Sequence, residues 1–91
     1  MERQIETKLK REVKKIGGLA LKFTSPGMAG VPDRLVLLPR GKAVFVELKA
    51  PGQKLRPLQL KRKSELEALD FQVYVIDSYQ GIVVFLQEVR K

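Results

Sequence analysis

Three charged residues have a spacing that could hold a metal ion. Asp33 is followed 14 residues later by Glu47, and Lys49 lies two residues beyond. If the intervening chain folds back as a hairpin, Asp33 lies opposite residue 47 or 48, with Cβ atoms about 5 Å apart. Two carboxylates this close repel each other unless one is protonated or a cation lies between them. Carboxylate oxygens suit Mg²⁺ or Mn²⁺, so the spacing predicts a divalent-metal site.

Lys49 adds positive charge to this predicted site. Side chains alternate along a strand, so Glu47 and Lys49 project to one face and Leu48 to the other. Hydrolysis of a phosphodiester needs an activated water and positive charge near the phosphate, which a metal and a lysine can supply without histidine. A salt-bridge cluster at a strand end is the structural alternative. It gives no reason for Gly30 and Pro32 before the aspartate, or for the basic charge of the chain.

The composition excludes several other kinds of site. The 91 residues include no Cys and no His, which excludes a disulfide framework, thiolate or imidazole metal ligands and a cysteine nucleophile. The serines, Ser25, Ser64 and Ser78, have no histidine to activate them. A net charge of +8 and a pI near 10.1 instead indicate a polyanionic partner. Nucleic acid is favoured over an anionic membrane surface.

Length and patterning predict one globular domain over residues 1–91. Hydrophobic residues make up 44% of the chain and charged residues 31%, which is typical of a folded domain rather than a disordered chain. No apolar run approaches the roughly 20 residues of a membrane span. The charged N-terminus does not have the pattern of a secretory signal. We therefore expect an intracellular protein without a membrane partner.

A two-stranded ribbon is needed to bring the carboxylates together. Residues 34–38 and 43–48 are apolar runs, the second rich in β-branched and aromatic residues, and both predict strands. Residues 39–42 contain a proline and a glycine, which favour a turn. Residues 25–30 form a loop of small residues before the aspartate. This loop either connects strands or approaches a ligand closely.

An amphipathic helix is predicted over residues 2–16 and ends at Gly17-Gly18. Its apolar stripe consists of Ile5, Leu9, Val13 and Ile16. Glu6 lies one position from this stripe and Glu2 one turn earlier, so either could face the body of the protein, although each alone is more typical of a surface residue. The rest of the helix is basic, with Lys8, Lys10, Arg11, Lys14 and Lys15. It is either a solvated face or a phosphate-contacting one, and the chain-wide charge favours the second.

The remaining segments complete an α/β pattern. Strands are predicted over residues 19–24 and 71–76, and a helix over residues 57–69 begins with a proline, which suits a first turn. Gln59 lies on the apolar face of this helix, where its amide either has a polar partner or is exposed at a frayed helix start. Residues 82–89 favour a helix, although a strand is also compatible. The order α-β-β-β-α-β-α predicts a mixed central sheet flanked by helices.

These motifs together resemble the PD-(D/E)xK nuclease superfamily. The Pro-Asp of that pattern is literal at Pro32-Asp33, and the Glu-x-Lys follows behind a helix that carries a glutamate. Within the superfamily, Gly30-Val31-Pro32-Asp33, Glu47-Leu48-Lys49 and Gln59 look like the virus-type replication-repair nuclease (VRR-NUC) domain. The resemblance extends over residues 6–76, which is nearly the whole chain. It implies a restriction-endonuclease-like α/β fold.

The resemblance also implies a set of metal ligands for Mg²⁺ or Mn²⁺. Asp33 and Glu47 would each supply a carboxylate, and the backbone carbonyl of Leu48 would add a third oxygen. Glu6 would be the helical carboxylate, which holds the metal directly or through water. Its distance from Gly17 fits the family better than that of Glu2 does.

The activity implied by the resemblance is a metal-dependent DNA nuclease. Lys49 would orient or activate the attacking water and offset phosphate charge, and Gln59 would lie beside the metal. Small members of such families commonly work as homodimers. The resemblance implies a structure-specific endonuclease in replication, recombination or repair. Its substrate would be branched or duplex DNA, such as Holliday-junction-like DNA. The setting would be the cytoplasm of a bacterial or phage-infected cell. A non-catalytic basic nucleic-acid-binding module and an end-trimming exonuclease remain open as alternatives.

Overall fold

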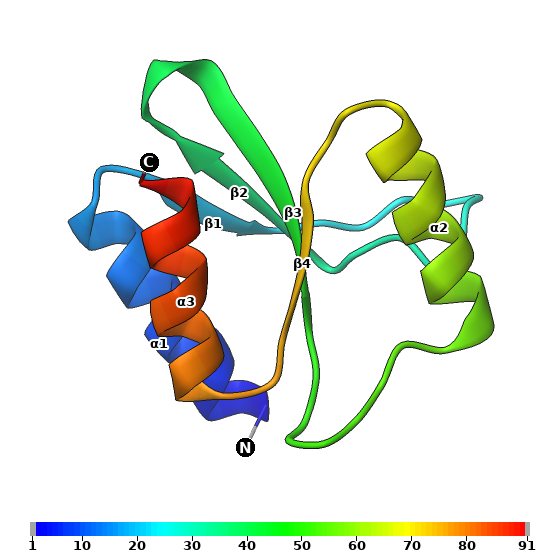
Figure 1. The fold of residues 1–91 in the computed structure, drawn as a ribbon, viewed down its shortest axis with the longest axis horizontal. Helices are drawn as coiled ribbons and strands as arrows, with labels where there is room; N and C mark the ends of the chain where they lie inside the picture. Colours follow the sequence, from blue (N-terminus) through cyan, green and yellow to red (C-terminus); the bar gives the residue numbers. More distant parts are fainter. Residues whose placement is uncertain (1, 91) are drawn as a thin grey trace.

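A four-stranded mixed sheet forms the centre of the fold. The computed structural model describes the backbone of residues 2–90 and the side chains of residues 3–90 (Figure 1). The strands follow the order β1 (Leu19–Lys22), β2 (Arg34–Leu38), β3 (Lys42–Leu48) and β4 (Val73–Ile76) across the sheet. The first three pair antiparallel, and β4 pairs parallel to β3. This is the mixed sheet that the sequence predicts.

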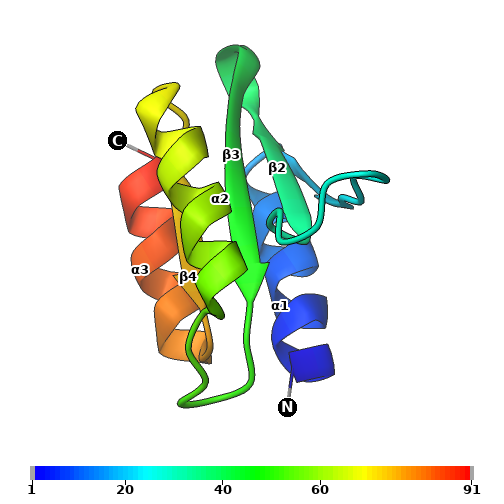
Figure 2. The same cartoon turned by 90° about the vertical axis from the view of Figure 1, so that its right-hand side faces the viewer.

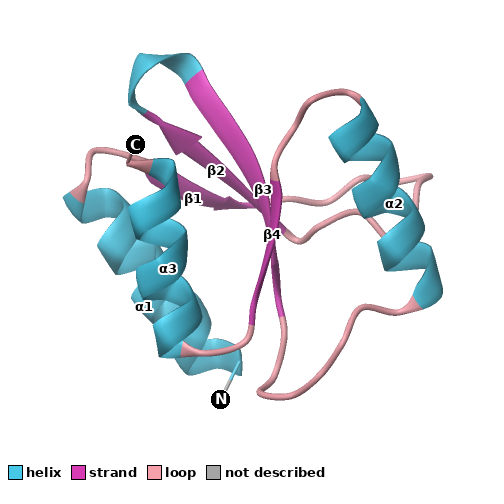
Figure 3. Ribbon diagram, in the orientation of Figure 1, coloured by secondary structure: helices cyan, strands magenta, loops and turns pink. Residues whose placement is uncertain are grey.

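Helices cover both faces of the sheet. α1 (Glu2–Lys15) and α3 (Tyr79–Val89) lie side by side on one face, and α2 (Pro57–Ala68) lies on the other (Figures 1 and 2). A parallel pair of strands needs a crossover connection, and α2 supplies it between β3 and β4 (Figure 3). Among the described residues, no helix has the length and apolar character needed to cross a membrane.

The hydrophobic core lies between the sheet and the pair α1 and α3. Alternate residues of the two central strands point to this face, and the helices contribute one apolar stripe each. The buried residues of this cluster are Ile5, Leu9 and Val13 of α1, Val36 and Leu38 of β2, Val44, Val46 and Leu48 of β3, Ile76 of β4, and Ile82, Phe85 and Val89 of α3. The stripe predicted for α1 is therefore confirmed at Ile5, Leu9 and Val13, and Ile16 packs partly buried beside it. The tail is a helix rather than a strand.

The element boundaries differ slightly from the prediction. β1 ends at Lys22 rather than residue 24, although the Phe23 N–H still donates to the Asp33 carbonyl oxygen at 2.8 Å. β4 begins at Val73 rather than residue 71, because the chain is still closing the end of α2. There Asp70 has a φ of 71° and the Phe71 N–H donates to the Leu66 carbonyl oxygen at 3.1 Å. Asp70 and Phe71 therefore complete the end of α2 and do not pair with β3.

Candidate active site

The hairpin register places the two predicted carboxylates side by side. Arg34 pairs with Val46, so Asp33 and Glu47 are the next opposed positions at the open end of the ribbon. The Asp33 N–H donates to Glu47 Oε1 at 3.2 Å, and the Leu48 N–H donates to Asp33 Oδ1 at 3.2 Å. The Glu47 carboxylate therefore accepts the backbone N–H of Asp33, and the Asp33 carboxylate accepts the backbone N–H of the residue after Glu47. The predicted opposition of residues 33 and 47 is confirmed.

Glu47 is buried, with a relative exposure of 7%. A buried carboxylate requires hydrogen-bond or ionic partners to offset its loss of water. Glu47 Oε2 accepts a hydrogen bond from Gln59 Nε2 at 3.3 Å and lies 3.8 Å from Lys49 Nζ. The Lys49 N–H in turn donates to the Ile76 carbonyl oxygen at 2.9 Å, which continues the parallel pairing beyond β3. Glu47 and Lys49 therefore share one face of the sheet, as predicted from strand alternation.

Gln59 links the first turn of α2 to this cluster. The residue is only 8% exposed. Its Oε1 accepts the Arg56 N–H at 2.9 Å, which satisfies a backbone donor at the helix N-terminus, while its Nε2 contacts Glu47. The sequence left open whether this amide has a polar partner or is exposed at a frayed end. The structure confirms the polar partner.

The loop before Asp33 lies against α2. Gly30 has a φ of 87°, and a Cβ at this position would come within 2.7 Å of Leu58 Cγ. The Ala29 carbonyl oxygen accepts a hydrogen bond from Arg62 Nε at 2.9 Å. A glycine is required here because its backbone has the left-handed conformation and packs closely on a neighbouring helix. The close approach observed for this loop is therefore to α2.

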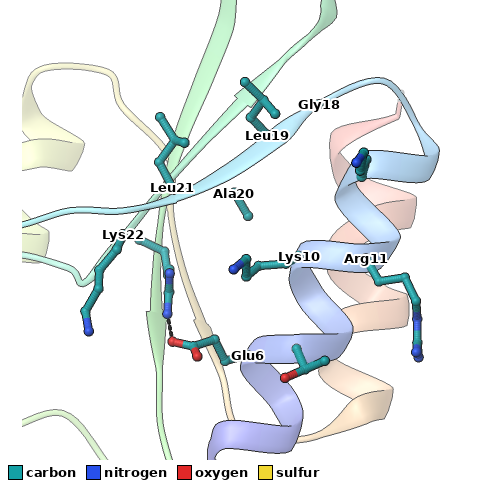
Figure 4. Close-up of a pocket in the computed structure, with 11 residues that line it drawn as sticks. Glu6, Lys10, Arg11, Gly18, Leu19, Ala20, Leu21 and Lys22 are labelled. Atoms are coloured by element: carbon teal, nitrogen blue, oxygen red, sulfur yellow. Dashed lines mark ion pairs between the residues drawn. The ribbon is translucent and has the colours of Figure 1, made fainter.

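Glu6 reaches the sheet from the face that packs on α1. It forms an ion pair with Arg34, drawn as the dashed line in Figure 4. Arg34 is on the same face of β2 as the core residue Val36 and is only 4% exposed. Burial lowers the pKa of the Arg34 guanidinium, which nevertheless stays protonated. The side chain of Glu2 lies outside the described residues.

The structure therefore brings together five of the six predicted site residues: Asp33, Glu47, Leu48, Lys49 and Gln59. Glu6 is held by Arg34 instead. Within the part of the chain that the structure describes, no three His, Cys, Asp or Glu side chains form a group able to hold a metal. Arg34 lies outside the motifs that predict the site from the sequence. Its signal is an arginine at an inward-facing position of an apolar strand, where a charged group is rare unless it is paired.

Comparison with known proteins identifies the family and the fold of this chain. The VRR-NUC domain family matches residues 3–80, a range that contains all of the predicted site residues. The chain belongs to the VRR-NUC family. A solved structure described as a VRR-NUC domain superposes on it with a TM-score of 0.90 and 31% sequence identity, and the match covers 94% of each chain. This VRR-NUC chain therefore has a restriction-endonuclease-like fold, as the sequence predicts.

A phage protein is also similar in sequence. The chain is 60% identical over 77 residues to "Putative nuclease p44" of Acyrthosiphon pisum secondary endosymbiont phage 1, and the match covers 85% of this chain and 83% of that protein. Membership of the VRR-NUC family and this relative together support a nuclease, an enzyme whose substrate is nucleic acid.

Proposed function

We propose that this chain is a metal-dependent DNA endonuclease that cuts branched DNA, with its active site at the carboxyl end of β3. The observation that supports the proposal is the buried Glu47, which contacts the Asp33 backbone, Lys49 and Gln59. A purely structural ion pair needs only one cation. Here two carboxylates, a lysine and an amide converge where β2 begins and β3 ends, which suits a site for a phosphate and a metal.

The oxygen atoms of this cluster fit a hard divalent cation. Asp33 and Glu47 offer carboxylate oxygens from opposed positions, and the Leu48 carbonyl lies between Glu47 and Lys49 in the chain. All-oxygen ligand sets are those that Mg²⁺ and Mn²⁺ prefer. We propose these three residues as the protein's ligands. Glu6, whose partner Arg34 directly follows Asp33 in the chain, would be a further carboxylate that acts through water rather than by direct contact. The bound ion would supply positive charge at the phosphate and make water a better nucleophile.

Lys49 and Gln59 have separate roles in the proposed mechanism. Lys49 Nζ, next to Glu47, would bind a non-bridging phosphate oxygen, offset the charge that develops in the transition state, and position the attacking water. Gln59 holds Glu47 Oε2 by its amide, so it would fix the orientation of the carboxylate. Asp33 is fixed by the Leu48 N–H in the same way. These contacts would leave the site little freedom to reorganise during the reaction.

The proposed assembly is a homodimer that acts in the cytoplasm of a bacterial or phage-infected cell. Two active sites related by a twofold axis would cut two strands of a branched substrate symmetrically. Four-way junctions have the approximate symmetry that such a pair of sites requires. The net charge of +8 would favour association with DNA of this kind.

The first test is cleavage of three labelled DNAs, a linear duplex, a four-way junction and a closed circle, with Mg²⁺, Mn²⁺ or EDTA. We expect metal-dependent cutting with a preference for the junction. Asp33→Asn should abolish cutting but leave DNA binding in EDTA largely intact, because it removes a charge from the metal site and little from the basic surface.

Asp70→Asn is the matched control, since Asp70 is exposed, carries the same charge and has a positive φ that asparagine also tolerates. It should cut like the wild type. Binding without cutting under every metal condition would instead favour a non-catalytic module. Failure to cut the closed circle while linear ends are degraded would favour an exonuclease.

A further inference from the structure

We infer that a groove between α1 and β1 binds the phosphate backbone of nucleic acid, on the sheet face opposite the carboxylate cluster. This α1–β1 groove is lined by the charged residues Glu6, Lys10, Arg11, Lys14, Lys22 and Arg34. Figure 4 shows Lys10 between the helix and the strand, with Ala20 pointing into the groove. The inference rests on the proposed function only in taking nucleic acid as the partner.

The charge of the α1–β1 groove fits a polyanion. Five of the six charged side chains are cationic, and Glu6 is the only carboxylate among the described residues that line it. Lys10, Lys14 and Lys22 are exposed and come from two elements that face each other across the groove. Lysines arranged in this way contact successive phosphates without reading bases. Because like charges repel, concentrating them without an anionic partner would disfavour the folded state.

Arg34 is the second observation that points to an anion. Its guanidinium is nearly fully buried, yet Arg34 Nε has no hydrogen-bond partner among the described residues. The anion that Arg34 does contact is the Glu6 carboxylate, which is much more exposed, at 37% of its side chain. Carboxylate and phosphate oxygens present the same charged acceptors to an arginine. Glu6 therefore occupies a position in which a phosphate oxygen could replace it.

Neighbouring backbone positions connect the α1–β1 groove to the proposed active site. Lys22 pairs with Arg34 in the sheet, and Asp33 directly precedes Arg34. The Phe23 N–H also donates to the Asp33 carbonyl oxygen at 2.8 Å. Nucleic acid held in the groove would thus pass beside the strand end that carries Asp33. The groove would bind phosphates that flank the one to be cut.

The test is DNA binding measured by fluorescence anisotropy in EDTA, where no cutting occurs. Lys10→Gln/Lys22→Gln should weaken binding several-fold and reduce the slope of log affinity against log salt by about 1 for each lysine. Lys42→Gln/Lys61→Gln removes the same charge from β3 and α2 and is the control. It should change both quantities much less. Equal losses of DNA affinity in the two double variants would show that the attraction comes from charge spread over the whole surface. That result would overturn the proposal that the groove binds DNA.

Glu6→Gln tests the buried end of the α1–β1 groove. Without the competing carboxylate, Arg34 is available to phosphate, so affinity in EDTA should rise several-fold above that of Glu88→Gln, which removes the same charge from an exposed position of α3. Equal affinities would assign Arg34 a purely structural role and overturn this part of the site. Cutting that persists in Asp33→Asn would refute the proposed active site alone, because the binding assays in EDTA do not depend on it.

Discussion

At the scale of single residues, Gln59 is the clearest case of one side chain with two partners. Its carbonyl oxygen accepts the Arg56 N–H and its amide nitrogen donates to Glu47. One side chain therefore both completes the N-terminus of α2 and fixes a buried carboxylate of the proposed active site. Any change at this position affects helix stability and carboxylate orientation together.

Gln59→Ala removes both contacts. We expect the free energy of unfolding to fall by roughly 1–2 kcal/mol, because a helix-start hydrogen bond and a buried one are lost. Cleavage should fall about 10–100-fold, the range typical of residues that orient a metal ligand. Urea unfolding and initial cleavage rates measure the two effects.

Gln87→Ala is the control for this variant, because Gln87 is an exposed glutamine in α3. Its stability should stay within about 0.5 kcal/mol of the wild type. If Gln59→Ala behaves like Gln87→Ala in both assays, neither contact of Gln59 contributes to stability or to the site.

The sequence predicts part of this cluster correctly because part of it is local. The opposition of Asp33 and Glu47 follows from strand alternation and a short turn, both visible in the sequence. The pairing of Glu6 with Arg34 is different, since it depends on where α1 lies over β2. That placement results from packing of the core stripes, and no local pattern near either residue contains it.

At the scale of elements, the contact between the loop before β2 and α2 positions the site. Gly30 packs on Leu58 and Arg62 binds the Ala29 carbonyl, so the chain leading to Asp33 and the helix carrying Gln59 are joined. The sequence predicts the loop and the helix separately. Their contact joins segments about 30 residues apart, so it requires the crossover that brings α2 back over the sheet.

Gly30→Ala should test this contact. The substitution imposes a strained left-handed backbone, which costs about 1–2 kcal/mol, and also places a methyl group 2.7 Å from Leu58 Cγ. We expect a larger loss of stability than in Gly27→Ala, where φ is 86° but no described atom lies within 4 Å of an added Cβ.

Thermal or urea unfolding of the two glycine variants separates backbone strain, which they share, from the contact with α2. The cleavage rate of Gly30→Ala should also fall, because a displaced α2 moves Gln59. Equal stabilities in the two variants would show that the loop and α2 do not constrain each other.

At the scale of the whole molecule, the two sheet faces have different tasks. One face packs on α1 and α3 and carries the core, and the other carries the carboxylate cluster beneath α2. Tyr74 belongs to the core face. Its ring meets Phe85 of α3 edge to face with ring centroids 4.9 Å apart. Partial burial, and secondarily the charge of Glu88, raise the pKa of the Tyr74 hydroxyl.

This raised pKa predicts a loss of stability in alkali. Above the ordinary tyrosine pKa of 10.0, the unfolded chain releases this proton while the folded chain retains it, so stability falls as pH rises. Tyr74→Phe should therefore lose less stability than the wild type between about pH 9 and 11. Unfolding by urea across this range measures the difference. Tyr79→Phe, at an exposed tyrosine, should follow the wild type. Parallel curves for all three proteins would contradict this expectation.

The role of α3 in the core affects how freely its sequence can vary among relatives. The family match ends at residue 80, yet Ile82, Phe85 and Val89 fill the core beside Leu9 and Val13 of α1. These α3 side chains bond to no site residue, and what they supply is apolar volume. Selection at those positions can therefore accept many exchanges that conserve volume, so that relatives would lose resemblance in this segment first. A gene fragment trimmed where the family match ends would encode the whole carboxylate cluster on a domain that lacks one of the two helices covering its core.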